Sequence, residues 1–328
     1  MRRPGSTARP RRRHALHALL VLLALGLPHP GVEAASFHRD QLIFLGRYDT
    51  FLGAYRIVIP VVFQRQAWAD GSRVDFEYKA WAAWNGRWEP VLYETGALRA
   101  DPADLNALVA EYVRARRGSD REIAVQRTAD HAFMLRYRAP RTEFTLTTGP
   151  IPLSVTDDDP QGAHAYGVGE ATAALNGRTV RGRVLYEQLP RRGARALDQS
   201  GVRLGQSDFM VLALEGGPVL LVNHARQARG FMLAALLGDG GRRAGDAAVQ
   251  WGEARPDPLT GRPVPQRWAL RSPGLGLAGE LREWGRNITR GSGAGPGAPL
   301  YGMFMVRGEV RVQGRPHPAF GLNAHVQD

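Results

Sequence analysis

The chain has 328 residues, and its 43 lysine and arginine residues against 31 aspartate and glutamate residues give a formal charge of +12. A composition of 44% hydrophobic and 23% charged residues is that of a globular protein and excludes a largely disordered chain. Cysteine is absent, which excludes disulfides, thiolate metal sites and a cysteine nucleophile.

The N-terminal segment has the order of a secretory signal peptide. It begins with six arginines in thirteen residues, continues with an apolar run at residues 18–27, and ends in small residues before Ala35. The apolar run has ten residues, whereas a membrane-spanning helix needs about 20. We therefore expect residues 1–34 to be a cleaved signal peptide, no transmembrane span after cleavage, and a periplasmic or secreted protein.

The remainder of the chain alternates in the manner of antiparallel sheet. Residues 74–81 place Val74, Phe76 and Tyr78 on one face and three charged residues on the other, which predicts a half-buried strand. Residues 133–138, 143–148 and 310–313 alternate in the same way. Pro60 interrupts an apolar run, which indicates an edge strand or a bend.

Turn signals separate these runs. Asn85-Gly86 and Asn176-Gly177 favour the positive φ angles of two-residue hairpins, as do residues 70–71 and 216–217. A single segment, residues 104–117, has helical spacing of apolar residues, basic residues near its end and Gly118 after it. Many strands with one helix predict barrels or sandwiches.

A polar stretch rich in arginine and glycine, residues 190–200, separates two strand-rich halves. We therefore expect an N-terminal β domain at residues 35–190 and a C-terminal β domain at residues 191–328. The arginines are scattered among acidic residues and form no basic patch, so we expect no nucleic-acid partner.

The hairpin at residues 164–189 is the most informative stretch for function. A period of two puts Tyr166 and Glu170 on one face of the first strand, whereas Tyr186 and Glu187 take opposite faces of the second. A carboxylate inside an apolar barrel would have a raised pKa and could act as a general acid. The alternative is an aromatic residue in the core with a solvated glutamate.

This hairpin and the residues after it resemble the secreted lipocalin-like family that includes AttH-type proteins and carotenoid 1,2-hydratases. The corresponding segments are residues 182–189, 207–217, 266–270 and 273–277. The resemblance implies a mainly antiparallel all-β fold with two lipocalin-like β-barrel domains in tandem and one inserted helix. The acidic motif of the family appears here as Leu-Tyr-Glu-Gln-Leu at residues 185–189 and retains only the glutamate.

In the hydratases of this group an acidic residue protonates an alkene, and water then captures the cation. The resemblance therefore makes Glu187 the candidate acid, with Tyr186 as its partner. Candidate ligand-binding residues are chosen by their position, and they are Tyr166, Glu170, Asp208, His224 and Trp268.

Neither a cofactor nor a metal site is expected. The spacing Gly274-Leu275-Gly276-Leu277-Ala278-Gly279 matches a dinucleotide-binding motif, but no helix pattern follows it, so we interpret these glycines as positions where strands bend. The histidines show no metal-ligand spacing.

Three functions stay open from the sequence. The first is an exported protein that binds an apolar ligand, such as a lipid or an isoprenoid-like molecule, in a barrel cavity. The second is a hydratase or isomerase that acts on an isoprenoid-like alkene through a general acid. The third is an envelope interaction module without a small ligand. A polar cluster in an enclosed pocket would favour the enzyme, an apolar pocket the carrier, and filled barrels the module.

Overall fold

The computed structural model describes residues 34–51, 53–68, 71, 73–99, 104–118, 120–159, 162–192, 206–225, 232–238, 241–290 and 298–327. Nearly all of the predicted signal peptide, Asp70 of the first predicted turn and most of the predicted boundary at residues 190–200 lie outside these residues.

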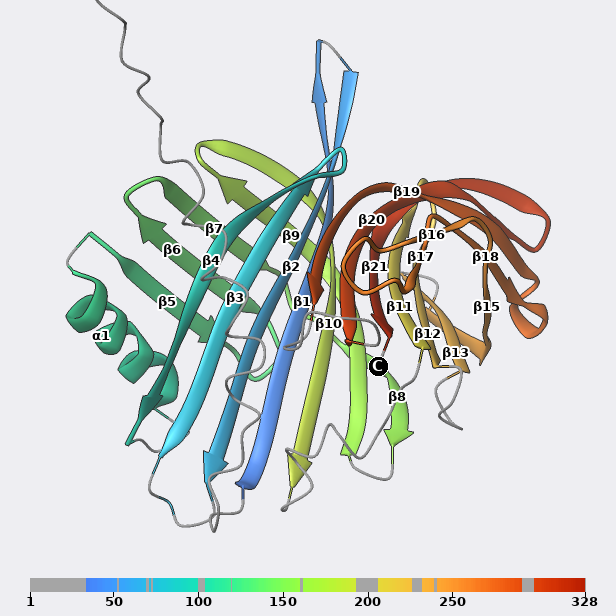
Figure 1. Ribbon diagram of the computed structural model, residues 1–328. Coiled ribbons are helices and arrows are strands. Elements are labelled where there is room, and N and C mark those ends of the chain that lie inside the picture. The colour runs from blue at the N-terminus through green and yellow to red at the C-terminus, as the bar shows by residue number, and fades with distance from the viewer. Residues whose placement is uncertain are drawn as a thin grey trace, which may run out of the picture.

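The first part of the chain forms one ten-stranded antiparallel sheet that curls into a half-barrel, blue to green in Figure 1. The strand order is β4-β3-β2-β1-β10-β9-β7-β6-β5, and β8 pairs with β9 beside this path. The strands are β1 (Ala34–Thr50), β2 (Gly53–Trp68), β3 (Val74–Trp84), β4 (Arg87–Leu98), β5 (Glu122–Arg127), β6 (Phe133–Ala139), β7 (Thr142–Thr148), β8 (Leu153–Asp159), β9 (Gly162–Leu175) and β10 (Arg178–Arg192).

The second part forms a nine-stranded antiparallel sheet that closes further, into a nearly complete barrel, yellow to red in Figure 1. Its strand order is β14-β13-β12-β11-β21-β20-β19-β18-β15, and β16 and β17 form a separate small hairpin. The strands are β11 (Gln206–Leu214), β12 (Val219–Ala225), β13 (Met232–Gly238), β14 (Gly241–Asp246), β15 (Ala248–Trp251), β16 (Ala254–Pro256), β17 (Pro263–Pro265), β18 (Arg267–Ser272), β19 (Leu277–Arg290), β20 (Leu300–Val312) and β21 (Arg315–Gln327).

The two sheets share one topology. In each, the first strand lies in the middle and pairs on one side with the second strand and on the other with the last. This arrangement brings the two ends of each half of the chain together. The predicted fold class, two antiparallel lipocalin-like units with one inserted helix, is confirmed.

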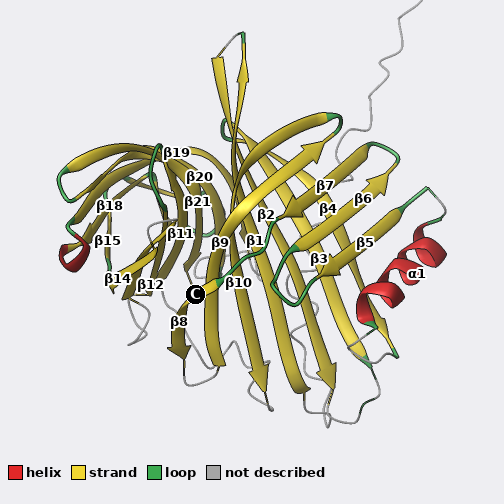
Figure 2. Ribbon diagram, turned by 180° about the vertical axis from the view of Figure 1, so that it is seen from behind, coloured by secondary structure: helices red, strands yellow, loops and turns green. Residues whose placement is uncertain are grey.

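The helix is α1 (Leu105–Arg117), which connects β4 to β5 and lies at the outer edge of the half-barrel in both Figure 1 and Figure 2. Leu105, Val109 and Val113 form its buried face, with the helical spacing visible in the sequence. Gly118 ends it with a positive φ of 94°. None of the helices in the described ranges is both long enough and apolar enough to cross a membrane.

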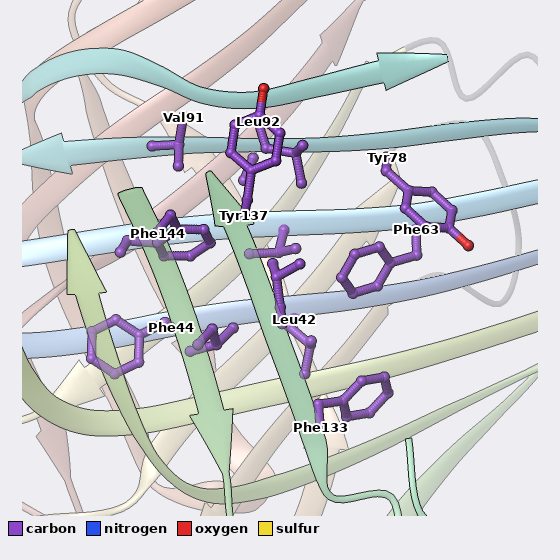
Figure 3. Packing of buried hydrophobic residues seen from close by; sticks show 14 of the residues in the cluster. Leu42, Phe44, Phe63, Tyr78, Val91, Leu92, Phe133, Tyr137 and Phe144 are labelled. Carbon is purple, nitrogen blue, oxygen red and sulfur yellow. The ribbon is translucent and has the colours of Figure 1, made fainter. Parts of the chain in front are cut away.

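The core of the half-barrel lies between its two curled layers. Leu42, Phe44 and Phe63 from β1 and β2 face Phe133 and Phe144 from β6 and β7 (Figure 3). All five side chains are almost fully buried. Even-numbered residues of β1 therefore point inward, because side chains alternate along a strand.

The outer face of the half-barrel packs against the second sheet. Odd-numbered residues of β1, such as Ile43 and Leu45, share an apolar cluster with Val211, Leu221 and Phe320 of the second sheet. The central strands are consequently buried on both faces, which explains the continuous apolar run at residues 42–45.

Two local predictions need correction. Pro60 does not lie in an edge strand, because β2 runs between β1 and β3. Instead, the pairing of β2 with β3 is interrupted between the pairs Val58–Ala83 and Val61–Ala80. Pro60, which has no backbone N–H to donate, lies in this interruption. Strand β3 is not half-buried, since its charged face is buried as well.

The charged face of β3 is neutralised by local partners. Lys79 Nζ lies 2.9 Å from Glu77 Oε2, and Trp68 Nε1 donates to Asp75 Oδ2 at 2.8 Å. Asp75, Glu77 and Lys79 are each less than 9% exposed. Paired charges can thus occupy a face that the alternation alone assigns to solvent.

The predicted turns and the glycine-rich segment behave as ordinary sheet connections. Asn85-Gly86 and Asn176-Gly177 both have positive φ angles, as two-residue hairpins require. Residues 273–275 form a short 3-10 turn between β18 and β19, and Gly276 adopts a φ of 60°. A strand follows this turn, so the helix that a dinucleotide site requires is missing from the described segment.

Candidate functional site

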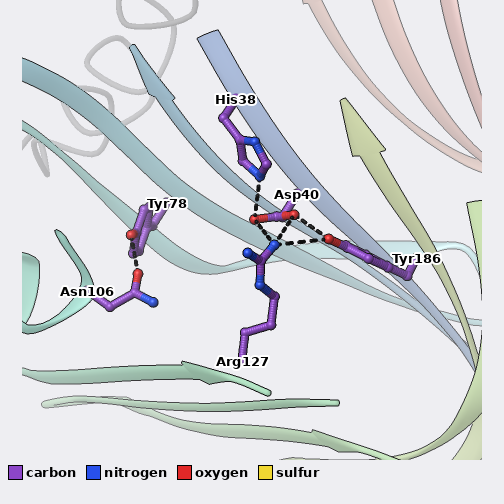
Figure 4. Close-up of polar contacts among 6 residues, drawn as sticks. All are labelled: His38, Asp40, Tyr78, Asn106, Arg127 and Tyr186. Carbon is purple, nitrogen blue, oxygen red and sulfur yellow. Dashed lines mark hydrogen bonds and ion pairs between the residues drawn. The ribbon is translucent and has the colours of Figure 1, made fainter. Parts of the chain in front are cut away.

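A cluster of polar side chains lies inside the half-barrel around Asp40 (Figure 4). His38 and Asp40 extend the inward face of β1 beyond the core residue Leu42. His38 Nε2 donates to Asp40 Oδ2 at 3.0 Å, and Arg127 Nη1 donates to Oδ1 at 3.1 Å. The Tyr186 hydroxyl donates to the same Oδ1. Asp40 thus accepts hydrogen bonds from three strands.

The electrostatics keep Asp40 ionised. Burial raises the pKa of Asp40, but the hydrogen bonds from His38 and Tyr186 and the charge of Arg127 outweigh it and lower the pKa below its ordinary value. Burial and the nearby carboxylate raise the pKa of Tyr186, so this residue stays a hydroxyl donor. A carboxylate that accepts from Nε2 fixes the histidine tautomer and leaves Nδ1 as a hydrogen-bond acceptor.

This cluster borders a cavity of about 260 Å³. Phe63, Val125 and Phe133 line its apolar part, and His38 and Arg127 line its polar part. The helix contributes Asn106, whose Oδ1 accepts a hydrogen bond of 2.6 Å from the Tyr78 hydroxyl. Both of these residues also line the cavity, so α1 and β3 are held together at its rim.

Tyr186 and Glu187, the two candidate catalytic residues, lie on opposite faces of β10. Tyr186 points into the half-barrel, whereas Glu187 points to the outer face. Glu187 Oε1 lies 2.9 Å from His164 Nδ1 and 3.3 Å from Arg39 Nη2. Burial raises the pKa of Glu187, but Arg39 and His164 outweigh it and lower the pKa to about 2. The lowered pKa supports Glu187 as the acidic member of an ion pair. A proton donor near neutral pH would instead need a raised pKa.

Tyr166 and Glu170 lie on the same outer face, in different surroundings. Tyr166 is fully buried between the sheets and stacks on Phe209 of β11 with a centroid separation of 6.4 Å. The Glu170 side chain is 77% exposed and lies 3.3 Å from Arg183. Neither residue lines the cavity beside Asp40.

The other three candidates meet inside the second barrel. Asp208 and His224 are directly paired across β11 and β12, and Trp268 Nε1 donates to Asp208 Oδ1 at 3.1 Å. Asp208 also accepts hydrogen bonds from Trp251, Asn323 and His325 at 2.8–2.9 Å. Burial raises the pKa of Asp208, but the hydrogen bonds from His325, Trp251 and Asn323 outweigh it and lower the pKa below its ordinary value.

The surroundings of Asp208 are tightly packed. Asp208, Trp268, Asn323 and His325 are each at most 2% exposed, and none lines the cavity beside Asp40 or the hollow beside Arg183. Gln327 Nε2 donates to His325 Nε2 at 2.9 Å, so both ring nitrogens of that histidine are occupied. This network is suited to joining strands rather than to receiving a ligand.

A larger hollow, of about 600 Å³, lies where Arg183 of β10 meets the hairpins of the second sheet. Glycine and proline residues of the turn at 216–218 form much of its wall, and its lining contains neither a histidine nor a carboxylate. Within the described residues, no three His, Asp or Glu side chains gather closely enough to hold a metal ion. The Asp40 cavity is therefore the best-equipped site for chemistry.

His38, Asp40 and Arg127 were not among the candidate residues predicted from the sequence. The signal for the first two was the period of two, which puts them on the same face as Leu42 and Phe44. Arg127 carried no such signal, because it is 87 residues away from Asp40. The Asp208 cluster was found in part, since Trp251, Asn323 and His325 were not among the candidates.

Comparisons with known proteins agree with this fold. The sequence matches no protein-family model and no curated protein sequence. The structure is similar to a protein assigned as AttH from Nitrosomonas europaea, with a TM-score of 0.55 and 13% identity over 88% of this chain and 92% of that one. It is also similar to kievitone hydratase from Nectria haematococca, with a TM-score of 0.52 and 11% identity over 90% and 89% of the two chains.

A third similar structure is CghA, with a TM-score of 0.50 and 15% identity over 89% of this chain and 88% of that one. The three neighbours cover nearly the whole chain, so the double lipocalin-like architecture is shared throughout. At these identities the likeness concerns the fold, and the expected resemblance to AttH-type proteins is confirmed at that level.

Proposed function

We propose that this protein binds a small organic molecule in the cavity of the N-terminal half-barrel. The observation that carries the proposal is the 260 Å³ cavity, whose lining combines the apolar side chains of Phe63, Val125 and Phe133 with the Asp40 cluster. Binding sites for small molecules combine apolar walls with a few convergent polar groups. Seven of the ten lining residues are polar, so the ligand combines polar groups with a smaller apolar part and is more polar than the ligand expected from the sequence.

A second function, proton-transfer chemistry of the hydratase or isomerase type, is favoured by the His38–Asp40 pair. Asp40 fixes the orientation of His38, and Nδ1 of the ring is the acceptor that a general base needs. In hydration of a conjugated double bond, His38 takes a proton from water while the water oxygen bonds to one carbon. The other carbon then receives that proton back from His38, and the product is an alcohol. Kievitone hydratase is among the structural neighbours.

The site of action is also a proposal. The order of basic, apolar and small residues before Ala35 supports export of the chain to the periplasm or the exterior. The protein would then bind its ligand in that compartment. An envelope interaction module without a small ligand is the alternative. The cavity and its polar cluster argue for a small ligand instead.

The test is a ligand screen followed by a comparison of two histidine variants. The protein is screened against a library of small aromatic and isoprenoid compounds by thermal shift, and the compounds that bind are incubated with it and analysed for added water. His38→Ala is compared with His317→Ala, because both histidines are half-buried and His317 lies outside the cavity.

We expect wild-type protein and His317→Ala to behave alike. His38→Ala should retain binding within a few fold and lose turnover by roughly 10²–10⁴-fold, the usual contribution of a general base. If the wild type binds a compound without turnover, the hydratase or isomerase hypothesis is rejected and the protein is a ligand carrier. A library without a single binder would refute the binding proposal itself.

A further inference from the structure

Arg65 occupies a distinctive position beside the candidate site. It follows Ile57, Ile59, Val61 and Phe63 on the inward face of β2, where those four residues belong to the core. In the register between β1 and β2 it lies directly opposite His38. Arg65 is half-buried and lines the cavity. Its guanidinium therefore stands next to the polar end of the site.

Arg65 differs from the other arginine of the cavity in its partners. Arg127 donates hydrogen bonds to Asp40 and Tyr186. For Arg65, no carboxylate, carbonyl or hydroxyl partner is found among the residues that the structure describes. A guanidinium carries five N–H donors, and none of the Arg65 nitrogens is buried away from solvent, so these donors are accessible to a ligand in the cavity. An anion in the cavity could accept hydrogen bonds from this guanidinium.

The charge of the lining indicates what kind of anion fits. Arg65 and Arg127 contribute two positive charges and Asp40 one negative charge, so the arginine and carboxylate groups of the lining sum to +1. A monoanion balances this charge, whereas a phosphate group with a charge of about −1.5 to −2 exceeds it. The planar fork of a guanidinium also matches the two oxygens of a carboxylate.

We propose that the ligand of this protein is a small aromatic or unsaturated carboxylic acid whose carboxylate is bound by Arg65. The proposal rests on the proposed function and names the substrate class of the same site. The cavity of 260 Å³ has room for roughly nine groups the size of water at ~30 Å³ each, which suits an acid of one ring and a short chain. Its ring packs against Phe63 and Phe133, and its double bond lies near His38.

The experiment uses trans-cinnamate as the probe and cinnamamide as its uncharged isostere. Binding of both is measured by isothermal titration calorimetry to the wild type and to Arg65→Gln, Arg65→Lys and Arg138→Gln. Arg138 is an exposed arginine of β6 that pairs with Glu122, so its variant removes the same charge outside the cavity. Phenyl phosphate is the dianionic control. Circular dichroism and thermal denaturation establish that each variant is folded.

We expect cinnamate to bind the wild type at least about tenfold more tightly than cinnamamide, as a charge-assisted hydrogen-bonded pair provides. In Arg65→Gln this preference disappears, whereas Arg65→Lys restores part of it and Arg138→Gln retains all of it. Phenyl phosphate should bind more weakly than cinnamate.

Two results would overturn the proposal. One is equal affinity for acid and amide in the wild type, and the other is an unchanged preference in Arg65→Gln. If cinnamate fails to bind while an uncharged library compound binds, the carboxylate assignment is wrong and the proposed function stands. If neither cinnamate nor any library compound binds, both are refuted.

Discussion

Glu187 and Tyr186, two neighbouring residues of β10, test whether the outer face of this strand serves stability and its inner face the ligand site. Glu187 lies in an ion pair on the outer face, and its pKa is lowered from 4.5 to about 2. One pKa unit corresponds to 1.36 kcal/mol, so ionised Glu187 contributes ~3 kcal/mol to the free energy of unfolding at pH 7. Glu187→Gln mimics the protonated acid, and we expect it to lower the stability by about this amount.

The pH dependence follows from the direction of the shift. Because the pKa is lower in the folded state, the stabilisation is complete well above pH 4.5 and is lost as pH falls toward the folded value of about 2. The difference between wild type and Glu187→Gln should therefore shrink from ~3 kcal/mol at pH 7 to ~2 kcal/mol at pH 3.5. Urea denaturation at the two pH values measures both differences.

Tyr186→Phe is the matched variant on the inner face. It removes the hydroxyl that donates to Asp40, so we expect a loss of ~1 kcal/mol in stability together with weaker ligand binding or turnover. Glu187→Gln should leave ligand affinity unchanged. A stable Glu187→Gln protein that has lost turnover would refute this reasoning and restore Glu187 as the chemical residue.

Two further substitutions test the rest of the structure. Asp208→Leu removes the acceptor of four hydrogen bonds in the second barrel, three of them buried, and we expect urea denaturation to show a loss of ~3–5 kcal/mol. A loss below ~1 kcal/mol would contradict the network. Gly86→Ala places a Cβ against the backbone oxygen of Trp284 at a φ of 88°, so calorimetry should show a lowered melting temperature. Gly177→Ala has a similar φ of 80° but open space around the Cβ, so its melting temperature should fall less. Equal melting temperatures for the two glycine variants would argue against close contact between the hairpin and the second sheet.

The antiparallel fold could be predicted because its causes are local. Alternation along each strand, positive-φ pairs such as Asn85-Gly86, and the helical spacing after Asp104 each depend on a few neighbouring residues. The resemblance of the hairpin at residues 164–189 to AttH-type proteins also predicted two lipocalin-like units in tandem. The same period of two already placed Tyr186 and Glu187 on opposite faces of one strand.

Which of these two faces lies inside the half-barrel was decided only by the tertiary structure. Alternation distinguishes a buried face from a solvated one, but β10 is buried on both, against the core on one side and near the second sheet on the other. The partners of Asp40 and Asp208 were equally inaccessible, because Arg127 and His325 are 87 and 117 residues away in sequence. A buried carboxylate takes its pKa from whatever charges the fold brings within a few ångströms, and sequence separation carries no information about that distance.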